Sequence, residues 1–205
     1  MNVLQEIFNK IPYAFPLNYI VFSLIIVFSI FIFLPVFGKI IDLFEQLQYK
    51  IFGNIFNDKV ASIIINRVTF IGTMTHELAH ALFAKIFGAK ITSLHVLDIF
   101  GGDTLGHVDF ATQGGIIKRN LQSFYSACAP VFVNCFLVLV ILSYWPYINN
   151  IFIHILFIYL IISFLNHASM SIQDLKLYFA SSIIAMPITV IIISILFVLL
   201  SKTPQ

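Results

Sequence analysis

The stretch LNYIVFSLIIVFSIFIFLPVF, residues Leu17–Phe37, decides which class of fold this chain adopts. A helix needs roughly 20 apolar residues to cross a bilayer core of about 30 Å, and this stretch supplies them without a charged side chain. It is too long for the apolar region of a signal peptide, and no small-x-small cleavage site follows it. We therefore expect a retained membrane anchor.

The composition of the whole chain agrees with this interpretation. Of its 205 residues, 60% are hydrophobic and 10% are charged, whereas a soluble domain has about 45–50% and about 25%. Disorder and a disulfide scaffold are excluded, because hydrophobicity is high and there are only two cysteines. With 11 Lys and Arg against 9 Asp and Glu, no basic stripe for nucleic acid is present. We expect an integral, multi-pass protein, of the cell membrane, in contact with the lipid bilayer.

Four further apolar runs follow the first. They cover Val60–Phe87, Ser123–Trp145, Asn150–Met170 with an extension to Asp174 left open, and Tyr178–Leu200. Gly88 is placed to end the helix of the second run. The runs predict an all-α polytopic membrane protein with about five transmembrane helices. We expect one membrane-embedded domain over residues 1–205.

Two segments differ from this pattern. Residues 39–59 carry apolar side chains at helical spacing between polar ones, which predicts an amphipathic helix. It lies either at the membrane interface or packed on the protein. Residues 89–115 alternate between apolar and polar side chains and contain five glycines, which predicts a β-like segment of two or three short strands. Bare strands cannot face lipid, so this segment must lie at the interface or against protein.

The motif His76-Glu77-Leu78-Ala79-His80 carries the chemistry. Two histidines four residues apart project from one face of a helix and can share a zinc ion. Glu77 beside them can act as the general base on a water molecule that the zinc activates. A charged residue within a membrane segment is costly, which favours a functional site. The alternative is a chance match, with two buried histidines bonded to neighbouring helices.

A catalytic zinc takes a third protein ligand. Phe83 and Ile86 stand where the extended metzincin motif needs glycine and histidine, and no glutamate follows Glu77. Asp174, at the end of the fourth run, is the preferred candidate, although it could also be a solvated carboxylate. His167, seven residues earlier, could replace Asp174 as the ligand or bond to it.

The remaining polar and sulfur residues are predicted to be structural. We expect His154 to be a hydrogen-bonded core histidine, and Cys128 and Cys135 to be packing residues. The other five are expected to be ordinary polar loop residues: His95, Asp98, Asp103, His107 and Asp109.

With these motifs the chain resembles the site-2 protease family of intramembrane zinc metalloproteases, as a divergent or minimal member. Asn166 and Asp174 keep the eight-residue separation of that family's second motif, and Ala129-Pro130 with Asn134 resembles a third. The resemblance implies that His76, His80 and Asp174 bind zinc and that Glu77 is the base. It also implies that Asn166 holds the substrate or the tetrahedral intermediate, and that the strand-like segment Ile91–Phe110 pairs with the substrate. The alternative for Asn166 is a polar residue that bonds between helices.

The sequence thus favours a zinc-dependent endopeptidase of the HExxH type, with a membrane protein or peptide as substrate. The alternative is a catalytically silent relative that binds membrane helices as a scaffold or chaperone. A metal transporter is disfavoured, because the polar residues form one compact group and no ladder through the spans.

Overall fold

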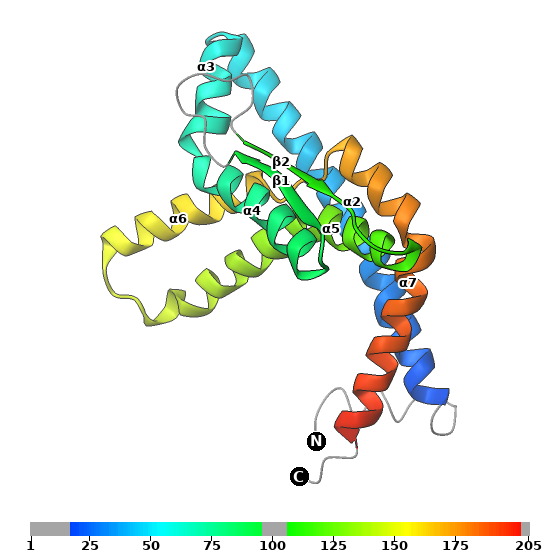
Figure 1. The fold of residues 1–205 in the computed structure, drawn as a ribbon. Helices are drawn as coiled ribbons and strands as arrows, with labels where there is room; N and C mark the ends of the chain where they lie inside the picture. The colour runs from blue at the N-terminus through cyan, green and yellow to red at the C-terminus, as the bar shows by residue number, and fades with distance from the viewer. Residues whose placement is uncertain (1–16, 96–105, 202–205) are drawn as a thin grey trace.

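The computed structural model describes residues 17–95 and 106–201 and is mostly helical. Six α-helices, a π-helix and a 3-10 turn form around one two-stranded sheet in these ranges (Figure 1). In chain order the elements are α2 (Leu17–Ile55), α3 (Asp58–Ser62), the π-helical η1 (Ile63–Val68), α4 (Phe70–Ile86), β1 (Lys90–His95), β2 (His107–Ala111), α5 (Ile116–Tyr144), the 3-10 turn η2 (Trp145–Tyr147), α6 (Ile151–Asn166) and α7 (Ile172–Ser201).

Three helices of the described part are long and apolar enough to cross a membrane: Tyr19–Ile55, Ile116–Tyr147 and Ile172–Leu200. The structure is therefore compatible with a membrane protein, but it does not confirm five spans. The 16 residues of α6 give about 24 Å of helix, less than the bilayer core of about 30 Å. The predicted span over 60–87 is divided among α3, η1 and α4, because the backbone leaves helical geometry at Thr69.

The prediction of a separate helix over 39–59 is wrong, because residues 39–55 continue α2 without a break. Pro35 lies inside this helix and cannot donate a hydrogen bond to the carbonyl of Phe31. The hydroxyl of Tyr178 in α7 donates to that carbonyl instead, over 3.0 Å. The two aromatic rings also stack, with 5.3 Å between their centroids. A residue distant in sequence thus satisfies the carbonyl that Pro35 leaves without its helical partner, which helps α2 to continue past the proline.

The helices meet around α5, which packs against α4, α6 and α7 (Figure 1). α5 and α6 run side by side away from this meeting point, and α2 and α7 form a second pair. The core at the junction contains Phe124, Cys128, Val131, Met170 and Tyr178. Cys128 is a buried free thiol in this core, as predicted, and Cys135 packs at its edge.

The strands expected within 89–115 are confirmed as an antiparallel pair, β1 with β2. Gly88 ends α4 as predicted, with a φ of 82° that favours glycine. The side chain of Gln122 in α5 is fully buried and binds the two segments of chain that enter and leave the hairpin. Its amide oxygen accepts from the Gln113 N–H, while its nitrogen donates to the carbonyls of Phe87 and Gln113. The sheet is therefore fastened to the helices at its base.

Candidate metal centre

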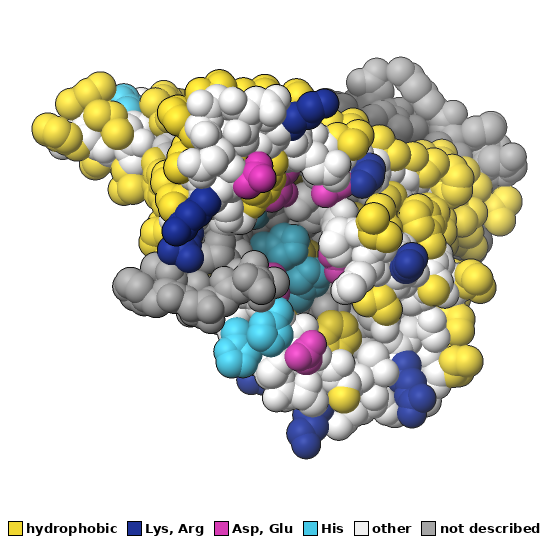
Figure 2. All heavy atoms as spheres, turned by 90° about the horizontal axis from the view of Figure 1, so that it is seen from above, with side chains coloured by type: hydrophobic (Ala, Val, Ile, Leu, Met, Phe, Trp, Pro, Cys, Tyr) yellow, Lys and Arg dark blue, Asp and Glu magenta, His cyan; other side chains and the backbone are white. Residues whose placement is uncertain are grey.

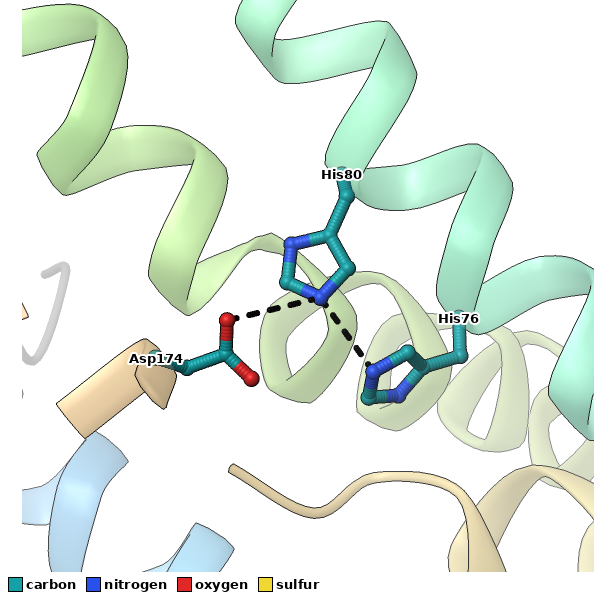
Figure 3. Close-up of side chains that lie close together, drawn as sticks. All are labelled: His76, His80 and Asp174. Atoms are coloured by element: carbon teal, nitrogen blue, oxygen red, sulfur yellow. Dashed lines mark hydrogen bonds and ion pairs between the residues drawn. The ribbon is translucent and has the colours of Figure 1, made fainter. Parts of the chain in front are cut away.

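His76 and His80 lie one turn apart on α4 and face α7 (Figure 3). Their Nε2 atoms are 3.2 Å apart, and His80 Nε2 is 3.7 Å from Oδ1 of Asp174. One ligand atom from each of the three residues lies within 4.8 Å of the other two. The side chains of His80 and Asp174 are 13% and 14% exposed. The structure thus brings together the three residues that the sequence proposed as metal ligands.

Backbone carbonyls fix the orientation of both imidazoles. Nδ1 of His76 is 2.8 Å from the carbonyl oxygen of His167, and Nδ1 of His80 is 2.8 Å from that of Ser126. A carbonyl can only accept, so each Nδ1 carries the proton and each Nε2 presents a lone pair. Two lone pairs facing each other at 3.2 Å repel unless a proton or a cation lies between them.

This donor set suits a zinc ion. Two nitrogens bound 2.0–2.1 Å from a tetrahedral zinc lie about 3.3 Å apart, close to the Nε2 separation observed. A histidine that binds a metal ordinarily donates its other N–H to a carbonyl or carboxylate, as both residues do here. Two imidazoles and a carboxylate form a common ligand set of catalytic zinc sites, which keep a fourth position open.

A proline inside one helix and the end of another leave the two carbonyls free. Pro130 in α5 has no N–H to donate to Ser126 four residues earlier, so the Ser126 carbonyl is free to accept from His80. The Ser126 hydroxyl in turn donates to the carbonyl of His80 over 3.1 Å. His167 directly follows the last residue of α6, where carbonyls lack partners within the helix. Both histidines are therefore oriented by carbonyls that a proline within α5 and the end of α6 leave free.

Asp174 lies in the first turn of α7, and the prediction that it ends the fourth run is wrong. α6 ends at Asn166, and a new helix begins after Ser171. The Ser171 hydroxyl accepts from the Asp174 N–H, and Asp174 Oδ2 accepts from the N–H and hydroxyl of Ser171. This reciprocal cap occupies Oδ2 and leaves Oδ1 facing His80. The Ser-x-x-Asp spacing of residues 171–174 is the signal that could have revealed the boundary.

A buried amide connects these supports. Asn134 of α5 is 0% exposed. Its nitrogen donates to the His167 carbonyl over 2.8 Å, and its oxygen accepts from the Thr75 hydroxyl over 2.7 Å. The carbonyl that holds His76 is thus itself held by α5, which in turn is bonded to α4 next to His76. Asn134 was noted in the sequence only as part of a motif, and its position between three elements was not foreseen.

The side chains of His167 and Asn166 are engaged elsewhere. Nε2 of His167 lies 2.9 Å from the Thr69 hydroxyl and 3.3 Å from that of Thr73, so the imidazole is outside the cluster and only its carbonyl serves the site. The prediction of His167 as third ligand does not fit this geometry, because its Nε2 is engaged by two threonine hydroxyls and the non-helical segment between α6 and α7 separates it from Asp174. Asn166 forms a reciprocal amide pair with Gln48 of α2, over 3.0 and 3.2 Å. Its contact with substrate stays a prediction.

Glu77 lies next to His76 on α4 and is half-buried. Its carboxylate is near enough to His76 and Asp174 for their charges to interact. Within the described residues no hydrogen bond to this carboxylate is found, so it is available to an incoming molecule. Figure 2 shows histidine side chains deep in a hollow on this face, with acidic side chains around them.

The other histidines differ from expectation. His95 and His107, with Asp109, are exposed on strands rather than in loops. Asp98 and Asp103 lie outside the described residues. His154 stacks on Trp145, with 4.8 Å between the ring centroids. In the described part of the chain its buried Nε2 has no hydrogen-bond partner, so the bond expected for a core histidine is not found at that atom.

The chain matches no protein-family model, no curated protein and no solved structure.

Proposed function

We propose that this protein is a zinc-dependent intramembrane endopeptidase that hydrolyses peptide bonds of membrane-protein substrates, similar to the site-2 protease family. One observation carries the proposal: the Nε2 atoms of His76 and His80 and the carboxylate of Asp174 converge, with their ligand atoms within 4.8 Å of one another (Figure 3). Both imidazoles already donate their Nδ1 protons to carbonyls, which leaves Nε2 for a metal ion. The three long apolar helices support a multi-pass location in the cell membrane.

In this mechanism the chain's own residues divide the work. Zinc bound at the site would lower the pKa of a water molecule to about 7 and polarise the peptide carbonyl. Glu77 accepts a proton from the attacking water on a carboxylate oxygen and delivers it to the nitrogen of the leaving amine. The hydroxyl that remains bonds to the carbonyl carbon of the peptide. The bond between that carbon and the nitrogen then breaks, which gives a new carboxyl group and a free amine. His76, His80 and Asp174 hold their positions through the carbonyls of His167 and Ser126 and the cap at Ser171.

The strand pair is the proposed substrate contact. A transmembrane helix satisfies its own backbone, so it must open locally before a peptide bond can be cut. Each strand of a two-stranded sheet has one edge that its partner does not occupy, and such an edge can pair with an extended peptide. α4 packs against both strands, so a peptide paired there would pass near the residues of the hollow.

Zinc content per purified chain tests the metal site. We expect one tightly bound zinc in the wild-type protein after passage through zinc-free buffer, none in His76→Ala, and a strongly weakened site in Asp174→Asn. Asparagine keeps an oxygen that can cap Ser171 and removes the charge, so this variant tests the ligand rather than the cap. Ser171→Ala is the matched control, because it removes the cap hydroxyl and keeps the carboxylate. A wild-type chain without zinc, or a His76→Ala chain that retains it, would refute the proposal.

Asn134→Leu tests the support behind His76. Leucine removes the amide that holds the His167 carbonyl, so we expect zinc affinity to fall on the order of 10–100-fold, as for other residues that orient metal ligands. Asn120→Leu, a change of the same type at a partly exposed site of α5, should leave the affinity unchanged. Competition with a chromogenic chelator measures both values. Equal affinities for the two variants would show that the amide has no part in orienting His76.

A further inference from the structure

Two histidines stand directly opposite each other at the end of the hairpin. His95 is the last residue of β1, His107 is the first of β2, and the two are partners in the register. Their rings stack at 4.6 Å between centroids, with 25° between the planes. Both residues are exposed, so burial does not explain why they are paired. Directly opposed side chains of an antiparallel pair have Cβ atoms about 4.5–5.5 Å apart, close enough to bind one ion.

A carboxylate on the same face offers a third donor. The ligand atoms of these three side chains are not gathered within 4.8 Å of one another, as those of His76, His80 and Asp174 are, so the side chains must turn to share an ion. Asp109 lies two residues after His107 on β2, and alternate residues of a strand share a face. Its Oδ2 is 4.0 Å from Nε2 of His107. The hydroxyl of Ser93, the register partner of Asp109, donates to this carboxylate over 2.7 Å and restrains it on the face of the two imidazoles.

The chemistry of these donors favours a late divalent transition metal. Neutral imidazole and carboxylate are the ligands that Zn²⁺ commonly takes. Protonated, the two rings would repel each other, whereas one cation shared between two neutral rings removes that repulsion. The side chains are exposed and can turn about their own bonds, so the ring nitrogens can approach a common ion without moving the backbone.

The place of the pair on the fold gives such a site a consequence. Gln122 holds the hairpin at its base, while the two histidines lie at the opposite end, where the strands separate. An ion bound there would join the two strand ends and hold both ends of the sheet closed. Figure 2 shows histidine side chains at the rim of the hollow as well as deep inside it. His76 and His80 lie on α4, whereas His95 and His107 lie on the hairpin strands, so the two pairs share no residue.

We propose that His95, His107 and Asp109 form a second metal site, for exchangeable Zn²⁺, at the end of the hairpin remote from Gln122. Its donors are distinct from those of the inner cluster, so it stands independently of the proposed peptidase activity. Because its donors are exposed, the ion at this site exchanges readily with solvent.

Calorimetric titration with Zn²⁺ alone tests this site. In the full-length His76→Ala/His80→Ala chain, which lacks the inner site, we expect one zinc to bind. Adding His107→Asn should weaken that binding at least about 10-fold, the lower effect seen when metal sites lose a supporting residue. His154→Asn, a change of the same type far from the hairpin along the chain, should leave it unchanged.

The wild-type protein provides a second measurement in case the inner variants fail to fold. Loaded with one tight zinc, it should take up one further, weaker equivalent, and His95→Asn or His107→Asn should lose only that one. No further uptake by the loaded protein, or uptake that survives His95→Asn/His107→Asn, would overturn the proposed hairpin site. Loss of the tight equivalent in His76→Ala concerns the inner site alone, so failures of the two proposals are distinguishable.

Discussion

A Glu77→Gln chain is expected to retain one tight zinc while it cleaves peptides about 10²–10⁴-fold more slowly than wild type, the usual contribution of a general base. Glutamine has nearly the shape of glutamate but cannot accept the proton of the attacking water. Glu77 is outside the cluster of His76, His80 and Asp174, so the zinc should stay. Cleavage of single-span membrane peptides in detergent, read by mass spectrometry of the new termini, measures the rates.

Glu45→Gln is the matched control, because it makes the same change at a partly buried glutamate of α2. It should leave the cleavage rate near that of wild type. Equal rates for Glu77→Gln and wild type would rule out the catalytic role. If neither the wild type nor Glu77→Gln cleaves any peptide and both bind membrane helices equally well, the silent scaffold is the better explanation. Zinc flux in proteoliposomes that survives Glu77→Gln would instead support transport.

Gly72→Ala is expected to cause the largest loss of stability among single methyl additions to this chain. A Cβ at Gly72 would lie 2.0 Å from the Ser163 carbonyl oxygen and 2.5 Å from Cδ2 of His167. The first of these atoms is backbone, so α4 and α6 would have to separate. The Ser163 hydroxyl bridges the helices at this point, accepting from the Gly72 N–H and donating to the Thr69 carbonyl, each over 2.8 Å.

We expect the free energy of unfolding to fall by about 3 kcal/mol, the upper end for overpacking. The melting temperature should then drop by about 6–12 °C, given about 2–4 °C per kcal/mol for chains of this size. Zinc affinity should fall as well, because His167 follows α6 and its carbonyl holds His76. Gly115→Ala is the control, since a Cβ there meets nothing within 4 Å. Melting curves that coincide for the two variants would contradict this account of the α4–α6 contact.

The parts of the fold that depend on local pattern could be predicted from the sequence. The i, i+4 spacing placed His76 and His80 on one helix face, Gly88 ended that helix, and alternation located the strands. These features depend on residues within a few positions of one another, so the sequence alone carries the information. The approach of Asp174 to the two histidines was also anticipated, although on the wrong helix.

The errors arise where distant residues decide. Pro35 and Gly38 are residues that usually disfavour a continuing helix, so local sequence gave no reason to extend the first helix to Ile55. The hydrogen bond from Tyr178 to Phe31 could not be predicted from the local sequence of α2 or of α7. The break between α6 and α7 falls inside a region interpreted as almost continuously apolar, where the cap at Ser171 outweighs hydropathy. The orienting roles of Ser126, Asn134 and His167 depend on contacts between α4, α5 and the end of α6, which local pattern does not specify.

The bond between Tyr178 and Phe31 also sets the angular position of α7. Tyr178 lies four residues after Asp174, so the two side chains share one face of the helix. A step of one residue about the axis of α7, about 100°, would break the tyrosine bond and turn the carboxylate away from His80 together. The Phe31 carbonyl is free to accept only because Pro35 has no N–H. A proline in the first helix therefore helps to set the rotation of the last helix about its axis, and with it the direction of the Asp174 carboxylate.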